Sequence, residues 1–175
     1  MPYCVMLLRP AEPQDAMAVA TVHVRSWQAG YRGLLPDSCL DSLRAEDRAA
    51  RYDFTHSDTA NPYTIVAVET GQVLGFATTR QCPDADSRDY GELAALYVDP
   101  DYWHRGLGVA LMSAARGRMV QTGFQKALLW VLAGNLRAES FYLKDGWRRD
   151  GVERTESMWG IDVHDFRFQR GLSIP

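Results

Sequence analysis

Glu92-Leu-Ala-Ala-Leu-Tyr-Val-Asp-Pro-Asp-Tyr-Trp-His-Arg-Gly-Leu-Gly-Val-Ala-Leu111 is the stretch that decides the fold. Its apolar part, Leu93 to Val98, has the composition of a short buried strand. The strand must end at Asp99-Pro100, because proline lacks an amide donor and disfavours helical geometry in the residue before it. From Gly108 onward, apolar and small residues recur at helical spacing through Leu111, Ala115 and Met119. The stretch therefore predicts a strand, a tight glycine turn and a helix.

This turn has a chemical consequence. The first N–H groups of a helix have no intrahelical partner, and the helix dipole is positive at that end. Gly106 and Gly108 allow a ligand to approach the backbone without meeting a Cβ atom. Arg105 adds a positive charge and His104 a hydrogen-bonding group. We therefore predict an anion site at this turn, most naturally for a phosphate or pyrophosphate.

Two known phosphate-binding patterns do not fit. A P-loop requires Gly-x-x-x-x-Gly-Lys-Ser/Thr, and the sequence has no such run. A dinucleotide fold requires Gly-x-Gly-x-x-Gly and an acidic residue about twenty positions later. Leu111 stands in place of the third glycine, and the residues near position 128 are Ala-Leu-Leu-Trp. A general nucleotide-binding domain stays as the weakest of the alternatives.

A third pattern does fit. The run Trp103-His104-Arg105-Gly106-Leu107-Gly108 resembles the Gln/Arg-x-x-Gly-x-Gly/Ala signature of the GNAT superfamily of N-acetyltransferases, with Trp103 where the family usually has Gln or Arg. A second run, Asn135 to Trp147, is similar to the family pattern Asn-x-x-Ala-x-x-Phe-Tyr-x-x-x-Gly-Phe and departs from it only at the final aromatic residue. The segment Ser26 to Pro36 is similar to the first-helix segment of one bacterial branch, where it borders the acceptor site.

The resemblance implies a binding site for acetyl-CoA as cosubstrate. Backbone amides would hold its pyrophosphate, and they belong to His104, Arg105, Gly106, Leu107, Gly108 and Val109. The end of the strand, Leu96, Tyr97 and Val98, would pair with the pantetheine arm like an added strand. The Val98 N–H would polarise the thioester carbonyl. Asn135 would hydrogen-bond the pantetheine arm, although the same residue also suits a helix N-cap.

Two side chains are implied as catalytic. Tyr142 would protonate the leaving thiolate, because a phenol with a pKa of about 10 keeps its proton at neutral pH. Glu92 would take the proton of the amine, directly or through water; the alternative is a solvated carboxylate at the strand end. Asp99 is a lesser candidate for the base and better suited to capping the turn. The sequence has no cysteine in a position matching an acyl-enzyme, which favours direct transfer in a ternary complex.

Length and composition set outer bounds. The 175 residues suit a single domain spanning 1–175. A net charge of −3 gives no basic footprint, which disfavours nucleic acid as a partner. Three cysteines without a close pair favour reduced thiols and a cytoplasmic location, and no Cys/His spacing resembles a metal site. No apolar run reaches the length of a signal peptide or a membrane span.

The remaining pattern gives the fold class. Strands are expected at 3–9, 63–69, 73–79, 93–98, 126–132, 147–152 and 163–170, and helices after 13, from 37, at 45–52, after 106 and at 135–145. Asp15 is the expected cap of the first long helix. The order predicts a mixed α/β (α+β) protein with a central sheet of about seven strands flanked by helices. It also resembles the GNAT fold, which implies a mostly antiparallel sheet.

The sequence thus favours an acetyl-CoA-dependent N-acetyltransferase acting on a primary amine of a small molecule or peptide. The alternative is a non-catalytic module that binds acyl-CoA or mediates an interaction, because Trp103 departs from the family pattern and the base is not defined. The acceptor cannot be derived from the sequence, and polyamines, amino acids, aminoglycoside-like drugs and peptide N-termini stay open. A homodimer through the last strands is also an expectation.

Overall fold

A computed structural model describes residues 6–55, 62–158 and 160–172. Seven of the elements within these ranges are strands, and they form one sheet in the order β1-β2-β3-β4-β5-β7-β6. All neighbouring strands are antiparallel except β4 and β5. The elements are β1 (Leu7–Pro10), α1 (Ala16–Gly30), α2 (Asp37–Ser42), α3 (Ala45–Ala49), β2 (Tyr63–Glu69), β3 (Gln72–Gln81), β4 (Gly91–Val98), α4 (Leu107–Gln121), β5 (Lys126–Leu132), α5 (Leu136–Lys144), β6 (Arg148–Met158) and β7 (Ile161–Gly171).

The expected fold class is confirmed, with differences at some boundaries. The last two strands are longer than predicted, because charged residues such as Arg154 and Glu156 alternate along β6 where an apolar pattern was expected. Trp147, expected at the start of that strand, is fully buried in the core ahead of it. The first expected strand began at Tyr3, but residues 1–5 lie outside the described ranges, and β1 begins at Leu7.

Asp15 occupies the N-cap position of α1, as expected, but the capping interaction is not the expected one. Its side chain makes no capping hydrogen bond to α1. It accepts a hydrogen bond from the Glu12 backbone N–H at 2.8 Å and forms an ion pair with Arg9, so it closes the short 3-10 turn Pro13–Asp15 that precedes the helix. The third helix ends at Ala49 and not at Tyr52, because the chain tightens there into turns such as Tyr52 N–H to Ala49 C=O.

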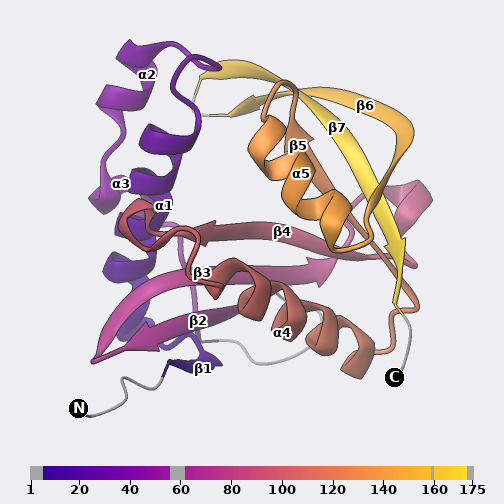
Figure 1. The fold of residues 1–175 in the computed structure, drawn as a ribbon, viewed down its shortest axis with the longest axis horizontal. Coiled ribbons are helices and arrows are strands. Elements are labelled where there is room, and N and C mark those ends of the chain that lie inside the picture. The colour runs from indigo at the N-terminus through magenta and orange to yellow at the C-terminus, as the bar shows by residue number, and fades with distance from the viewer. Residues whose placement is uncertain (1–5, 56–61, 159, 173–175) are drawn as a thin grey trace.

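Helices cover both faces of the sheet. Helix α4 contributes Leu111, Met112, Ala115 and Met119 to a core cluster with one face of β2, β3 and β4. Helix α1 contributes Val19 and Val22 to a second cluster with the other face, which includes Phe76. Helix α5 lies on the α4 side, where its aromatic residues pack on the same core cluster. In Figure 1, α4 and α5 lie in front of the strands, and α1, α2 and α3 gather at the left.

The sheet divides at β4. Strands β4 and β5 pair only at Gly91 with Ala127 and at Glu92 with Leu128. The register on the other side of β4 shifts at the same place, because Leu93 pairs with Thr79 and Ala95 with Thr78, which leaves Ala94 as an extra residue. Such a β-bulge bends the strand and re-aims its side chains. Beyond it β5 turns away from β4, as Figure 1 shows, and Ala94 is exposed in the middle of the sheet.

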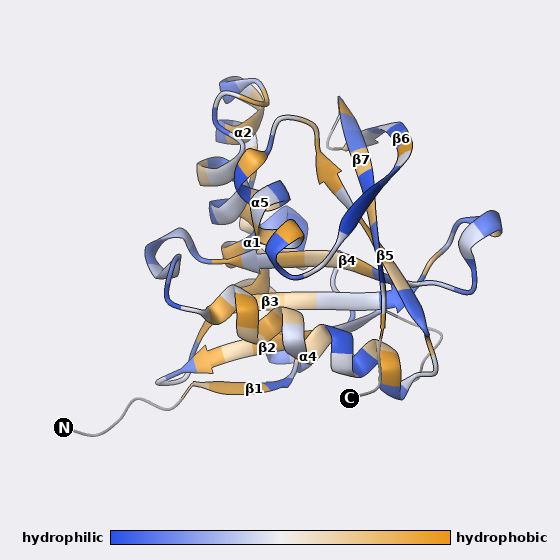
Figure 2. Ribbon diagram, turned by 45° about the vertical axis from the view of Figure 1, so that its right-hand side comes forward, coloured by the Kyte–Doolittle hydropathy of each residue, from blue (hydrophilic) through white to orange (hydrophobic). Residues whose placement is uncertain are grey.

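The two halves of the sheet also differ in polarity. In Figure 2, β6 and β7 carry more hydrophilic residues than β2, β3 and β4. No helix in the described ranges is long and apolar enough to cross a lipid bilayer. Cys39 and Cys82, the two described cysteines, are free thiols.

Candidate active site

A cleft of about 600 Å³ opens where β4 and β5 separate, on the side of α4 and α5. We call it the α5 cleft. Its walls are the end of β4, the turn before α4, the end of β5 and one face of α5. Ten of the eleven residues predicted to bind the cofactor line it: Leu96, Tyr97, Val98, His104, Gly106, Leu107, Gly108, Val109, Asn135 and Tyr142. The structure thus brings together two motifs that are about thirty residues apart in the chain.

The N-terminus of α4 forms one end of the cleft. Gly106 precedes the helix with a φ of 84°, and no side chain caps this end. The first intrahelical bond runs from the Ala110 N–H to the Gly106 carbonyl, so the amides of Leu107, Gly108 and Val109 precede it. A Cβ atom added at Gly106 would meet nothing within 4 Å. Uncapped amides beside open space are what an anion site at a helix N-terminus requires.

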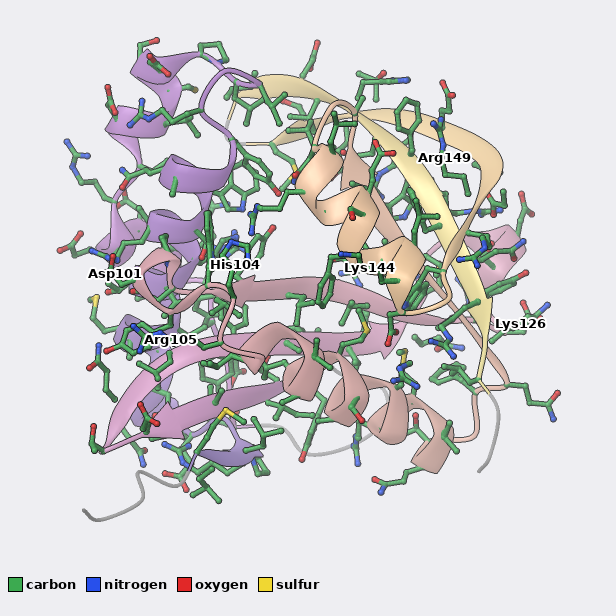
Figure 3. All side chains as sticks on the ribbon, viewed as in Figure 1. Asp101, His104, Arg105, Lys126, Lys144 and Arg149 are labelled. Carbon is green, nitrogen blue, oxygen red and sulfur yellow. The ribbon has the colours of Figure 1, made fainter. Side chains whose placement is uncertain are left out.

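Arg105 is the exception among the predicted residues. Its guanidinium lies 4.9 Å from the centre of the Tyr102 ring and lines a separate hollow with Asp99 and Asp101. Its charge was expected in the cleft because Arg105 adjoins Gly106, but adjacent residues in a turn point in different directions. His104 lies at the cleft with a positive φ of 63°. Figure 3 shows the two side chains leaving the turn on different sides.

The free edge of β4 forms the floor of the cleft. The Asp99 N–H donates to the Leu74 carbonyl of β3 at 2.8 Å, which fixes the alternation of the antiparallel ladder. By that alternation, the N–H groups of Leu96 and Val98 point away from β3 and toward the cleft. No β5 residue pairs with β4 beyond Glu92. This edge can therefore accept an extended ligand as an additional strand.

Trp103, the departure from the family pattern, holds the end of this edge. Its indole N–H donates to the Val98 carbonyl at 2.8 Å, and the Ser26 hydroxyl donates to the same oxygen at 2.8 Å. The guanidinium of Arg137 lies 3.8 Å from the centre of the indole ring. The Val98 carbonyl is thus occupied by protein donors, and an extended ligand must use other groups of the edge.

This arrangement gives a stability prediction. Trp103→Phe keeps an aromatic ring under Arg137 but removes the N–H, so we expect the free energy of unfolding to fall by about 1 kcal/mol and Tm by about 2–4 °C. Ser26→Ala should have a similar effect. The double variant should lose more than the sum, because only then does the part-buried Val98 carbonyl lack both donors. Thermal melts of the four proteins measure this, and strictly additive losses would contradict the shared acceptor.

Tyr142 and Asn135 project from either end of α5 into the cleft. Tyr142 packs against the rings of Phe141, Trp147 and Phe168. Burial raises the pKa of Tyr142 above its usual value, and the nearby Tyr97 adds to the rise. The Asn135 side chain accepts from the Ala138 N–H at 3.2 Å, so Asn135 is the N-cap of α5, and this cap does not use the amide nitrogen.

A second cleft, of about 590 Å³, lies on the opposite side of the sheet, between α1 and the strands β6 and β7. We call it the α1 cleft. It shares part of its lining with the α5 cleft: Tyr31, Leu93, Ala94, Ala95, Tyr97, Trp130 and Leu132. The two clefts therefore meet where the sheet divides. Two ligands entering from opposite faces would come into contact beside the bulge of β4.

Glu92 lies in the α1 cleft, next to this meeting point. The alternative of a solvated carboxylate is wrong, because Glu92 is only 3% exposed. Its Oε2 accepts from the Nε of Arg80 at 2.6 Å, which leaves Oε1 outside this ion pair. Asp99 is occupied elsewhere: it caps the turn through the Asp101 N–H and pairs with Arg25.

Sequence reasoning missed one acid near the meeting point. Beside it, Tyr31 and Tyr97 line both clefts, and burial raises the pKa of both hydroxyls. Asp165 on β7 is buried and paired with Arg154 at 3.2 Å. An acidic residue at an inward-facing position of a strand, such as Asp165, could have been recognised from the sequence as a candidate site residue. Only the fold shows that Asp165 lines the same cleft as Tyr97. In the described residues, no three His, Cys, Asp or Glu side chains come together in a way that could hold a metal ion.

Comparisons with known proteins identify the family of the chain. The model of the acetyltransferase (GNAT) family matches residues 24–147. An uncharacterized N-acetyltransferase of Bacillus subtilis is 28% identical over 131 residues, which cover 75% of this chain and 74% of that protein. A probable N-acetyltransferase of Mycobacterium tuberculosis is 26% identical over 170 residues, 96% of this chain and 95% of that protein.

Solved structures are similar in fold. The PaiA N-acetyltransferase of Thermoplasma acidophilum, solved in complex with coenzyme A, matches with a TM-score of 0.74 at 20% identity, over 95% of this chain and 99% of that chain. At this identity the likeness concerns the fold alone. The family match extends over more than half of the sequence, so the chain belongs to the GNAT acetyltransferase family. We therefore class it as an acyltransferase.

Proposed function

We propose that this protein transfers the acetyl group of acetyl-CoA directly to a primary amine, with both substrates bound at once. The observation that carries the proposal is the meeting of two clefts from opposite faces of the sheet at the bulge of β4. One cleft has the uncapped helix N-terminus that suits a diphosphate. The other has a carboxylate beside the meeting point. Direct transfer needs both sites open to each other, and a covalent acyl-enzyme does not.

The residues would divide the chemistry among them. Acetyl-CoA supplies the thioester, which the amides of the α4 turn and the free edge of β4 would hold. The Val98 N–H would donate to the thioester oxygen as charge develops on it. Glu92 would take the amine proton through Oε1, directly or through a water molecule. Tyr142 would give its proton to the sulfur as the carbon–sulfur bond breaks.

The first test is binding and turnover together. Titration calorimetry should give saturable binding of acetyl-CoA, and a thiol-release assay with a broad panel of amines should give turnover with at least one. An absence of saturable binding would end the proposal. Tight binding without turnover on any amine would favour the non-catalytic acyl-CoA module. Competition by ATP or NAD as effective as that by CoA would favour a nucleotide-binding domain.

A further inference from the structure

Arg80 and Glu92 form an ion pair in the α1 cleft, and their side chains differ strongly in exposure. The carboxylate of Glu92 is almost covered, with 4% of its side chain exposed, whereas 37% of the Arg80 side chain is exposed. Both residues line the cleft. A ligand in this cleft therefore meets the guanidinium first, although the pair as a whole is neutral.

The guanidinium is fixed in orientation and only partly used. Its Nε donates to Glu92 at 2.6 Å, and in the part of the chain that the structure describes its two terminal nitrogens have no hydrogen-bond partner. A guanidinium held at Nε presents its remaining N–H groups as a planar fork, which matches the two oxygens of a carboxylate. Burial lowers the pKa of the Arg80 guanidinium, but the hydrogen bond and negative charge of Glu92 and the nearby Asp84 outweigh it, so that pKa is raised overall and the charge is retained.

Arg154, on the facing wall, is occupied. It pairs with Asp165 at 3.2 Å and with Glu156 at 3.1 Å, and it lies 4.1 Å from the centre of the Trp130 ring. Two carboxylates around one guanidinium leave this part of the lining with surplus negative charge. Arg48 and Arg51 also line the cleft, but Arg80 is the arginine that Glu92 fixes next to the meeting point of the two clefts. The cleft therefore offers an anion subsite at Arg80.

The position of Arg80 relates the anion subsite to the transfer point. Its partner Glu92 directly precedes Leu93 and Ala94, which line both clefts. One or two residues of strand correspond to roughly 3–7 Å. The carboxylate that holds Arg80 thus belongs to the same short section of β4 as the meeting point of the clefts, and an acceptor that reaches both would carry its anionic group near its amine.

We infer that the acceptor is an amine that carries a carboxylate close to its nitrogen, as an α- or β-amino acid does, with Arg80 binding the carboxylate and Oε1 of Glu92 facing the amine. This inference rests on the proposed function. It disfavours polyamines, which have no group for Arg80 to bind.

The test compares matched acceptors with the unmodified enzyme. Thiol release at fixed acetyl-CoA is measured for an amino acid, its carboxamide and its decarboxylated amine, for example leucine, leucinamide and isoamylamine, and for the phenylalanine series. Spermidine is added as a polycation. We expect kcat/KM for the acid to exceed that for the carboxamide and the amine by about 10²-fold, as loss of a charge-assisted fork predicts.

Variants then assign the preference to Arg80. In Arg80→Gln the ratio of acid to carboxamide should fall from about 10² to about 1, and in Arg80→Lys it should be intermediate, because lysine keeps the charge without the fork. The ratio cancels any loss of rate caused by leaving Glu92 unpaired. Arg149→Gln, which changes an exposed arginine paired with Glu153 at 3.6 Å, should keep the full ratio. Calorimetric titration with CoA verifies that each variant is folded.

Each outcome decides between the two claims. If the unmodified enzyme acetylates isoamylamine or spermidine as well as it does leucine, the inference fails and the proposed function stands. If CoA binds but no amine is acetylated, both fail. If Arg80→Gln keeps the full ratio, the carboxylate is bound elsewhere and the assignment to Arg80 is overturned.

Discussion

Replacing Tyr142 with phenylalanine is expected to lower kcat by about 10²-fold, a barrier increase of about 2.7 kcal/mol, while the Kd for acetyl-CoA changes by less than about threefold. The substitution removes only the hydroxyl. The ring keeps its contacts with Phe141, Trp147 and Phe168, so packing and the shape of the α5 cleft should be preserved. What is lost is the proton for the departing sulfur, which is needed only as the carbon–sulfur bond breaks.

The pH dependence gives a second readout of the same role. Burial raises the pKa of Tyr142, so the phenol stays protonated beyond its ordinary pKa of about 10. A proton donor with a raised pKa gives no decline in rate until the pH passes that higher value. We therefore expect no alkaline limb from Tyr142 in the kcat profile between about pH 7 and 10.

Two other tyrosines serve as comparisons for Tyr142→Phe. Tyr63→Phe should leave kcat unchanged, because Tyr63 is half-buried on β2 under Arg118 and lines neither cleft. Tyr31→Phe removes a hydroxyl at the meeting point of the two clefts. Steady-state kinetics with calorimetry separates turnover from binding. Full turnover in Tyr142→Phe, or the large loss appearing in Tyr31→Phe alone, would mean that Tyr142 is not the donor.

The order of elements along the chain and the glycine turn before α4 were predictable because both depend on local signals. Pro100 ends β4, Gly106 begins the helix after a turn with positive φ, and Asn135 caps α5, each for reasons contained in a few consecutive residues. The predicted class of sheet followed from the order of such elements. Family resemblance then supplied the roles of side chains that no spacing rule could assign.

The division of the sheet could not be predicted in the same way. It depends on one unpaired residue, Ala94, whose place as a bulge is set by the register of β4 against β3. Register is a property of two strands at once, and Leu93 to Val98 reads as an ordinary buried run. The pairing of Glu92 with Arg80 was hidden for the same reason, since the two residues are twelve apart and meet only across neighbouring strands.

The charged residues that line the α1 cleft could not be predicted from the sequence either. Asp37 and Asp41 lie on α2, close in sequence to the segment similar to an acceptor-site helix, but both pair with Arg32 on the surface and line neither cleft. The carboxylates that line the α1 cleft include Glu92 and Asp165, which lie on strands far apart in the chain. Only the assembled sheet brings these two acids to one cleft.

Gly106→Val is expected to raise the Kd for coenzyme A by about 10²-fold or more, equal to about 2.7 kcal/mol, which is the contribution of one or two charge-assisted hydrogen bonds. Gly106 has a φ of 84°, which disfavours a β-branched residue, and its missing Cβ faces open space at the helix N-terminus. A valine there would occupy the place of the diphosphate and would also shift the amides that should hold it.

Backbone strain alone must be separated from this loss of binding, and Gly71 offers the matched comparison. It has a φ of 81°, a Cβ added to it would also meet nothing within 4 Å, and it lies in the turn between β2 and β3, outside both clefts. Backbone strain should therefore lower the free energy of unfolding of Gly71→Val and of Gly106→Val by a similar amount, roughly 1–2 kcal/mol. Gly71→Val should not change the Kd for CoA. Calorimetric titration and thermal melts of both variants measure the two quantities. The backbone strain is common to both variants. A loss of affinity found only in Gly106→Val therefore assigns the diphosphate to the N-terminus of α4. Retained affinity in Gly106→Val would place the cofactor elsewhere.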